Sequence, residues 1–263
     1  MRFHKPTLGI LLILAGAQPL LAETPEEKGL WVAEETQRLD AGFEDYTVDG
    51  QIIIQSKSGN QAERRFTLSA LEVVNDGDKR LIAISYPPDV KGTVSLTFSH
   101  GLEPDDQWLY LPSLRRTKRL SARDKTGSFI GSEFAFEDLG SYEVKKYSYK
   151  WLRDENIDGH DTYVLEEIPQ YDFAGYARLE SWVDKKTHRT RKIVFYDLKN
   201  RPLKELRSYD FQQYAGRYWR PDRMVMTNYQ NGNVSTINWT NYRFKTGLDG
   251  RNFEPTRLQR VSR

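Results

Sequence analysis

Residues 106–139 read DQWLYLPSLRRTKRLSARDKTGSFIGSEFAFEDL, and this central block joins aromatic, basic and acidic segments. Trp108 and Tyr110 lie near its start, and several phenylalanines lie near its end. Between these apolar ends are six basic residues, namely Arg115, Arg116, Lys118, Arg119, Arg123 and Lys125. A plain solvent loop would not carry so many aromatic side chains. We therefore expect the central block to contact something amphiphilic.

The chain around the central block is rich in strands, because apolar and β-branched residues alternate with polar ones over stretches of six to twelve residues. About a dozen antiparallel strands cannot remain in a flat sheet, so the sheet must curl into a barrel or half-barrel or split into a sandwich. The expected strands are 46–56, 64–74, 80–86, 93–99, 107–111, 145–152, 162–168, 177–183, 189–196, 204–214, 217–228 and 233–244.

Local signals mark one helix and several turns. Thr24-Pro25-Glu26-Glu27 is a capping box with proline at the first helical position, and it predicts a helix that ends before Gly42. Leu30, Trp31 and Leu39 predict a thin apolar stripe on this helix. Asn231-Gly232 is typical of a type I′ hairpin turn, and Asp158-Gly159 indicates a similar turn.

The N-terminus predicts secretion. A short basic region is followed by an apolar run over residues 8–17 and by Leu20-Leu21-Ala22 before an acidic stretch. This pattern is typical of a signal peptide cleaved after Ala22, and an uncleaved anchor is the alternative. We expect an exported protein with residues 1–22 as signal peptide and residues 23–263 as one domain, since no linker or repeat divides the chain.

The composition of the mature chain restricts its partners. Removing residues 1–22 takes away Arg2 and Lys5, which leaves 37 basic and 37 acidic residues. A net charge of zero argues against nonspecific nucleic-acid binding. The chain has no cysteine, so we expect neither disulfides nor a lipid tether on a thiol.

A curled sheet has a concave face, and large side chains are available to line it. Pairs such as Ile193 and Phe195, Met224 and Met226, and Ile237 and Trp239 recur at strand period, which is also typical of an ordinary half-buried core. Few helices are predicted to fill the concavity, so leftover volume would form a ligand site. The candidate cavity residues are Ile52, Ile54, Phe66, Leu68, Leu96, Phe98, Trp108, Tyr110, Phe129, Ile130, Phe134 and Phe136.

Catalytic motifs are weak. His100, His160 and His188 have no neighbour at metal-ligand spacing, so no metal site is expected. The Gly-Ser pairs do not form a G-x-S-x-G elbow or a phosphate-binding loop. Two nearby carboxylates could serve a glycoside hydrolase, but they could equally neutralise the preceding basic run. These acids are Glu133, Glu137 and Asp138.

The central block resembles the signature of the LolA-like outer-membrane lipoprotein-sorting family. The resemblance rests on Trp108-Leu109-Tyr110-Leu111-Pro112, on the basic turn (Arg115-Arg116 and Lys118-Arg119-Leu120-Ser121), on Gly127-Ser128-Phe129-Ile130-Gly131-Ser132-Glu133-Phe134 and on Phe136-Glu137-Asp138-Leu139. Lys91-Gly92, Trp182-Val183-Asp184 and Lys192-Ile193-Val194-Phe195-Tyr196 extend it over nearly the whole mature chain.

This resemblance implies a mainly β fold of the α+β kind, in which a large curled antiparallel sheet forms a half-barrel and a few helices cover an apolar cavity. It implies a monomeric periplasmic carrier of a lipid or lipoprotein, without cofactor or catalytic residues, that works with an RND-type (MMPL-like) inner-membrane transporter. Arg115, Arg116 and Arg119 would contact a phosphate head group or an acidic partner, unless they pair with Glu133, Glu137 and Asp138.

Three hypotheses follow from the sequence. The first is the lipid carrier, which requires an apolar cavity. The second is an interaction module with a filled core and no continuous cavity. The third is a carbohydrate-active hydrolase, in which Glu133 or Glu137 faces a polar cleft beside a second carboxylate.

Overall fold

Thirteen antiparallel strands form one continuous sheet in the computed structural model, which describes residues 23–121 and 123–262. The strands are β1 (Asp45–Gln55), β2 (Gln61–Leu71), β3 (Lys79–Tyr86), β4 (Val94–Phe98), β5 (Asp106–Leu111), β6 (Arg116–Arg119), β7 (Tyr147–Ile157), β8 (His160–Pro169), β9 (Arg178–Asp184), β10 (Thr190–Tyr196), β11 (Pro202–Tyr214), β12 (Tyr218–Asn228) and β13 (Val234–Phe244). The predicted signal peptide lies outside the described residues.

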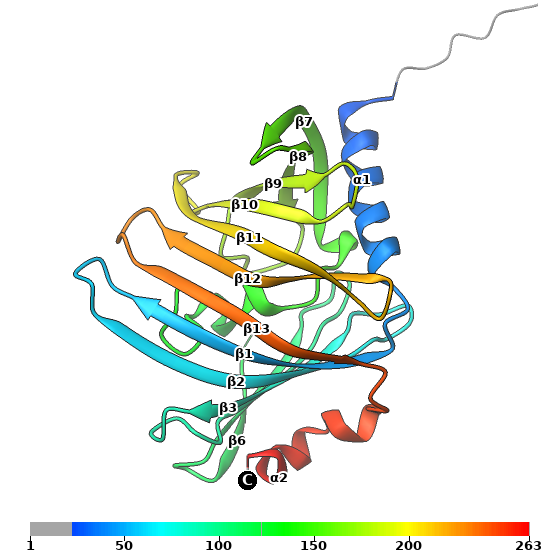
Figure 1. The fold of residues 1–263 in the computed structure, drawn as a ribbon. Coiled ribbons are helices and arrows are strands. Elements are labelled where there is room, and N and C mark those ends of the chain that lie inside the picture. The colour runs from blue at the N-terminus through cyan, green and yellow to red at the C-terminus, as the bar shows by residue number, and fades with distance from the viewer. Residues whose placement is uncertain (1–22, 122, 263) are drawn as a thin grey trace, which may run out of the picture.

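The sheet order is β6-β5-β4-β3-β2-β1-β13-β12-β11-β10-β9-β8-β7. β1 pairs with β13, so the two ends of the strand sequence meet in the middle, and β6 and β7 remain as free edges. The sheet is therefore curled but not closed (Figure 1). This open half-barrel confirms the predicted fold class.

Twelve of the strands match predicted ones, and β6 is the exception. Its sequence, Arg-Thr-Lys-Arg, contains no apolar residue, so no hydrophobic alternation announces it. β6 is nevertheless held by pairing with β5, in which Trp108 lies opposite Arg119 and Leu111 opposite Arg116. Basic side chains on an edge strand also discourage pairing with another chain.

The turns agree with the sequence at one hairpin and differ at another. Asp158 and Gly159 both have positive φ, at 51° and 81°, so they form the expected type I′ turn between β7 and β8. The type I′ prediction for Asn231-Gly232 is wrong, because only Gly232 has positive φ. A longer connection forms there instead, since the carbonyl of Asn228 accepts the amide of Gly232.

The one long helix, α1 (Pro25–Asp40), begins at the predicted capping box, with Thr24 and Glu27 bonding reciprocally. The predicted apolar stripe is wrong. Leu30 and Trp31 are 42% and 45% exposed, whereas the buried face consists of Gly29, Val32 and Ala33. The helix packs on β7, and small residues on its buried face permit this close approach. None of the described helices is both long and apolar enough to cross a bilayer.

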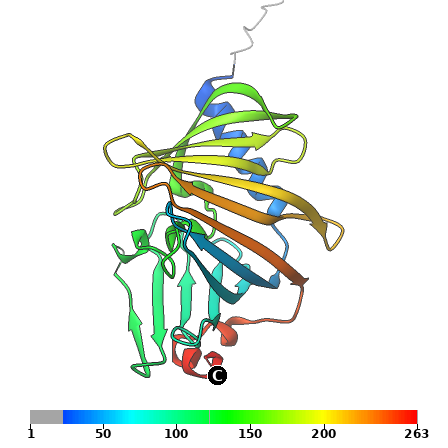
Figure 2. The same ribbon diagram turned by 60° about the vertical axis from the view of Figure 1, so that its left-hand side comes forward.

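The sheet is buried on both faces over part of its width. Along β3, Ile82 and Ile84 face the concave core, whereas Leu81 and Ala83 pack on the opposite side. There the C-terminal segment, which includes α2 (Leu258–Val261), inserts Phe253 and Leu258 against the sheet. Figure 2 shows this red segment beside β3 to β6, and α1 behind the strands at the other end of the sheet.

We predict that Gly29→Ala destabilises the protein, although alanine is the better helix former by about 1 kcal/mol. An added Cβ would lie 2.8 Å from the backbone nitrogen of Trp151 and 2.9 Å from that of Lys150. Separating α1 from β7 to relieve these contacts should cost roughly 1–3 kcal/mol in the free energy of unfolding. Urea denaturation measures the change. In the control Gly250→Ala, where no atom lies within 4 Å, stability should stay within about 0.5 kcal/mol. An unchanged or increased stability of Gly29→Ala would contradict this packing.

Candidate functional site

A cavity of about 1000 Å³ lies between the concave face of the sheet, the second half of α1 and residues 137–145 of the connection between β6 and β7. In Figure 1 the green connection lies behind the central strands. Ten strands, β1 to β3 and β7 to β13, contribute side chains to the wall, because side chains alternate toward this face along each strand. Its apolar side chains include Phe43, Tyr46, Val48, Leu68, Leu139, Val144, Tyr176, Leu179, Ile193, Phe195, Leu206, Phe211, Trp219, Met224, Trp239 and Tyr242.

The connection between β6 and β7 is anchored on the sheet by a buried ion pair. The ammonium of Lys204, on β11, lies 2.6 Å from Asp138 and donates to the carbonyl of Glu133 at 3.0 Å. The side chains of Lys204 and Asp138 are almost completely buried. Tyr176 donates to the second oxygen of Asp138 at 2.7 Å. Breaking one partner of such a pair is costly, so the connection is held firmly over the concave face.

Phenylalanines of the same connection fill the concavity beside the cavity. Phe129 and Phe134 are almost fully buried in the main core, and a β-bridge between Ser128 and Ala135 holds the loop that carries them. Phe129 makes edge contacts with Phe66 and Phe136. The connection therefore plugs one part of the concave face and leaves another part hollow.

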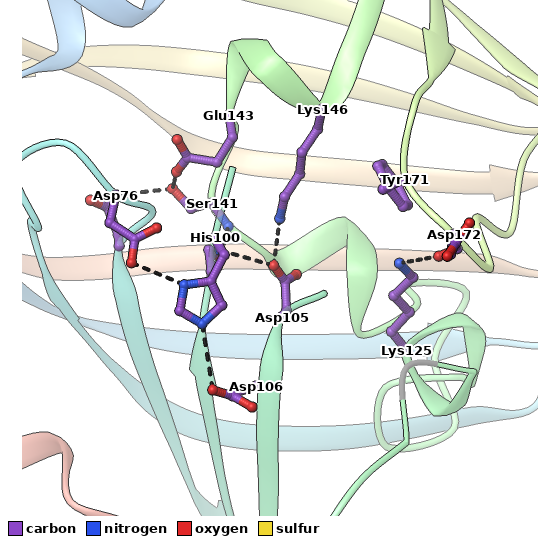
Figure 3. Close-up of polar contacts among 12 residues, drawn as sticks. Asp76, His100, Asp105, Asp106, Lys125, Ser141, Glu143, Lys146, Tyr171 and Asp172 are labelled. Carbon is purple, nitrogen blue, oxygen red and sulfur yellow. Dashed lines mark hydrogen bonds and ion pairs between the residues drawn. The ribbon is translucent and has the colours of Figure 1, made fainter. Parts of the chain in front are cut away.

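A polar network ties the loops at one rim of the cavity (Figure 3). His100 lies between Asp76 at 2.9 Å and Asp106 at 3.5 Å, and Lys146 lies 2.6 Å from Asp105. Burial opposes protonation of His100, but the two aspartates outweigh it and raise its pKa. These contacts join the loops before β3, β5 and β7 into one rim.

A second polar cluster lies where α1 ends. Asp40, the last residue of α1, accepts hydrogen bonds from Arg220 on β12 and from Arg189 immediately before β10. Arg189 and Arg220 both line the cavity and are largely buried. Burial, together with the charge of Arg220, lowers the pKa of Arg189, and Asp40 only partly offsets this. This cluster places guanidinium groups on the cavity wall.

Glu137 is the most perturbed acid of the connection. Burial, reinforced by the charge of Asp138, raises the pKa of Glu137 to about 7. One of its oxygens accepts the amide of Gly175 at 3.3 Å, and the other has no partner among the described residues. Burial likewise raises the pKa of Glu167, which also lines the cavity, to about 7.

The structure separates the twelve candidate cavity residues into two groups on opposite faces. Leu68 is the member that lines the cavity. Seven others belong to the concave core around it, namely Ile52, Ile54, Phe66, Phe129, Ile130, Phe134 and Phe136. The remaining four pack on the opposite face under the C-terminal segment, namely Leu96, Phe98, Trp108 and Tyr110. Sequence alternation identified their shared face within each strand but could not tell which face is concave.

The basic turn of the central block lies away from the cavity. Arg119 pairs with Asp106, and Arg115 and Arg119 border a shallow depression of about 410 Å³ with Trp108, Tyr110 and C-terminal residues. The alternative pairing with Glu133, Glu137 and Asp138 is wrong for Arg119. Glu133 instead receives side-chain amides from Asn228, Asn231 and Asn233, and Asp138 pairs with Lys204.

Sequence reasoning missed the residues at the α1 end of the cavity. Arg189 lies far from Trp219 and Arg220 in the chain, and the three residues carry no shared motif. Ile193, Met224 and Trp239 carried a usable signal, because each belongs to a period-two pair on its own strand. Contact with α1 could not be deduced, since it depends on how the sheet curls.

The carboxylates do not form the arrangement expected of a glycoside hydrolase. Glu133 is absent from the cavity lining, while Glu137 and Asp138 are adjacent and Asp138 is neutralised by Lys204. The described residues also contain no group of three or more His, Cys, Asp or Glu that could hold a metal ion. The cavity is therefore characterised by its apolar side chains, by the connection that fills the concave face beside it and by its buried arginines.

The open antiparallel half-barrel is a LolA-like fold, and several solved structures share it. An outer membrane lipoprotein-sorting protein domain from Vibrio parahaemolyticus is 43% identical with a TM-score of 0.87, covering 89% of this chain and 99% of that one. A DUF1329 family protein from Desulfovibrio piger is 29% identical with a TM-score of 0.85 and the same coverage. A LolA superfamily protein from Nitrosomonas europaea, 23% identical with a TM-score of 0.70, covers 86% of this chain and 97% of that one and supports the fold alone.

This chain belongs to the LolA-like outer-membrane lipoprotein-sorting family. A family model described as "Uncharacterized protein" matches residues 76–260, which include the whole central block and the strands that follow it. A comparison with curated proteins gave no match. The predicted resemblance is thereby confirmed.

We predict that the stability of the protein falls as the pH rises through 7, in part because of Glu137. Its pKa rises from 4.5 to about 7 on folding, so the folded state holds an extra proton between these values, and this stabilisation disappears as the carboxyl ionises. Glu137→Gln should flatten the decline and be more stable at pH 8, by on the order of 2 kcal/mol. Urea unfolding from pH 5 to pH 8 measures this. The exposed control Glu103→Gln should retain the wild-type slope, and an equally steep slope in Glu137→Gln would contradict the assignment.

Proposed function

We propose that the protein is a periplasmic carrier that binds an acyl chain of a lipid or lipoprotein in the concave cavity. The observation that carries this proposal is a cavity of about 1000 Å³, lined by many aromatic and aliphatic side chains together with charged ones, inside an otherwise well-packed half-barrel. Ligand pockets in proteins are typically about 300–1000 Å³ and predominantly apolar, so the hollow is large enough for a ligand. The similarity to a lipoprotein-sorting protein domain supports the same proposal.

The energetics of acyl-chain transfer explain why a carrier needs such a cavity. Exposing an acyl chain to water costs about 0.8 kcal/mol per methylene, which amounts to on the order of 10 kcal/mol for a sixteen-carbon chain. A wall of aromatic and aliphatic side chains removes that chain from water. In this proposal Leu68, Ile193 and Leu206 contact the chain, while Phe66, Phe129 and Phe134 form a rigid boundary to the cavity.

The proposal also covers how the protein is exported and which membrane protein loads it. We propose export by the signal peptide of residues 1–22, cleaved after Ala22, and loading by an RND-type (MMPL-like) inner-membrane transporter. The basic turn suits an acidic surface on that transporter, because Arg115 and Arg116 are exposed and Leu114 beside them is 67% exposed. The carrier acts by binding and release and requires no catalytic group or cofactor.

The interaction-module hypothesis is less well supported, because it requires a filled core. The cavity and its lining by α1 and ten strands favour the carrier. The hydrolase hypothesis is disfavoured by the separation of Glu133 from the cavity and by the pairing of Asp138 with Lys204.

We predict that Ile193→Trp weakens the binding of 1-dodecanol by at least about tenfold, because the larger indole occupies cavity volume that the chain needs. Isothermal titration calorimetry on delipidated mature protein measures the affinity, and circular dichroism checks the fold. The matched control Leu198→Trp adds the same side chain at a position that is 72% exposed and should bind like wild type. Equal affinity of Ile193→Trp and wild type, or no binding by wild type, would overturn the proposed cavity.

A further inference from the structure

Two buried guanidinium groups share one carboxylate at the α1 end of the cavity. Arg220 contacts Asp40 through both terminal nitrogens, and the longer contact is 3.3 Å. Arg189 reaches the same carboxylate at 3.4 Å and the carbonyl of Leu39 at 3.5 Å. Both of these contacts of Arg189 are long, so α1 holds Arg189 only loosely.

Arg189 has unused hydrogen-bonding capacity on the cavity wall. The residue is only 8% exposed, and its Nε has no hydrogen-bond partner among the described residues. A buried donor without a partner costs free energy, and a buried charge costs more. Two positive groups against one negative group leave an excess of one positive charge in the cluster.

The neighbouring charged groups do not remove this excess. His188, which lies beside Arg189, packs against Trp31, and burial lowers its pKa. The cavity-lining acids Asp78 and Glu143 instead accept from the hydroxyl of Ser141, and burial raises the pKa of both. Arg38, also at this end of α1, is already paired with Glu35.

The cluster is continuous with the apolar wall. Trp219, Met224 and Tyr242 line the same cavity as the two arginines. Trp219 and Met224 lie on β12, the strand of Arg220, and Tyr242 lies on the neighbouring strand β13. A molecule with its anionic group at the arginines could therefore extend its chain along β12 and β13. Arginine is well suited to this task, because its planar fork binds phosphate or carboxylate oxygens with paired hydrogen bonds.

We propose that Arg189 and Arg220 bind the anionic head group of the cargo, so that the cavity selects acyl chains that end in a phosphate or a carboxylate over uncharged ones. This inference rests on the proposed carrier function and names the class of its ligand. Arg189 supplies the free donor, and Arg220, fixed by Asp40, supplies the second positive group.

Calorimetry with two chain-matched probes tests the proposal on delipidated mature protein. Dodecyl phosphate should bind wild type at least about tenfold more tightly than 1-dodecanol. Arg189→Met should reduce the affinity for dodecyl phosphate about tenfold and change that for 1-dodecanol less than about twofold. The exposed control Arg243→Met should leave both affinities unchanged.

Asp40→Asn distinguishes head-group binding from a purely structural role of the arginines. If they serve only to hold α1, removing the carboxylate loosens this end of the cavity and weakens both probes. If they bind an anion, Asp40 competes with it, and Asp40→Asn should tighten dodecyl phosphate by at least about threefold. Thermal unfolding of each variant shows whether the fold persists.

The outcomes separate this inference from the proposed function. Equal binding of both probes, with no effect of Arg189→Met, overturns the head-group site but retains the carrier. Failure of both probes overturns the carrier. Inorganic phosphate should show no binding at millimolar concentration, and binding as tight as that of dodecyl phosphate would identify a site for free phosphate, which contradicts the proposal.

Discussion

The structure depends on a mismatch between a wide curled sheet and the few elements available to cover its concave face. One helix and one connection must shield a face built by most of thirteen strands. The connection fills its share with Phe129 and Phe134 and is fixed by the buried pair of Lys204 and Asp138. The helix presents small residues to β7 and leaves the adjoining space hollow. A side-chain core is normally packed without large voids, so this cavity points to a ligand.

The central block explains how one stretch of sequence serves both faces of the sheet. Its first part forms β5 and β6 at the edge, where Trp108 and Tyr110 pack under the C-terminal segment. After the basic turn, the chain crosses to the concave side and inserts its phenylalanines there. The two apolar ends of the central block thus pack on opposite faces of the sheet, and the basic turn lies at the sheet edge between them. In our proposal this turn meets a partner, while buried arginines elsewhere meet the cargo.

Local sequence patterns predicted most of the fold, because strand alternation, the capping box at Thr24 and the Asp158-Gly159 turn are short-range effects. β6 was missed because pairing with β5 stabilises it without any hydrophobic pattern. The α1 stripe was wrong because close contact with β7 selects glycine and alanine over large apolar residues. The site was harder to predict. Leu68 was found from alternation, whereas Arg189 and Arg220 meet Asp40 only after the sheet curls, and a period of two does not tell which face becomes concave.

Native mass spectrometry of the mature protein, purified from its own periplasm without detergent, tests the central claim most directly. Protein that carries cargo should appear with an added mass, and fragmentation should release a molecule with at least one acyl chain. A head-group site at Arg189 further requires that this molecule carry a phosphate or a carboxylate. A spectrum that contains only the bare polypeptide, with no acyl-bearing molecule recovered by solvent extraction of the same sample, would contradict a carrier built around this cavity.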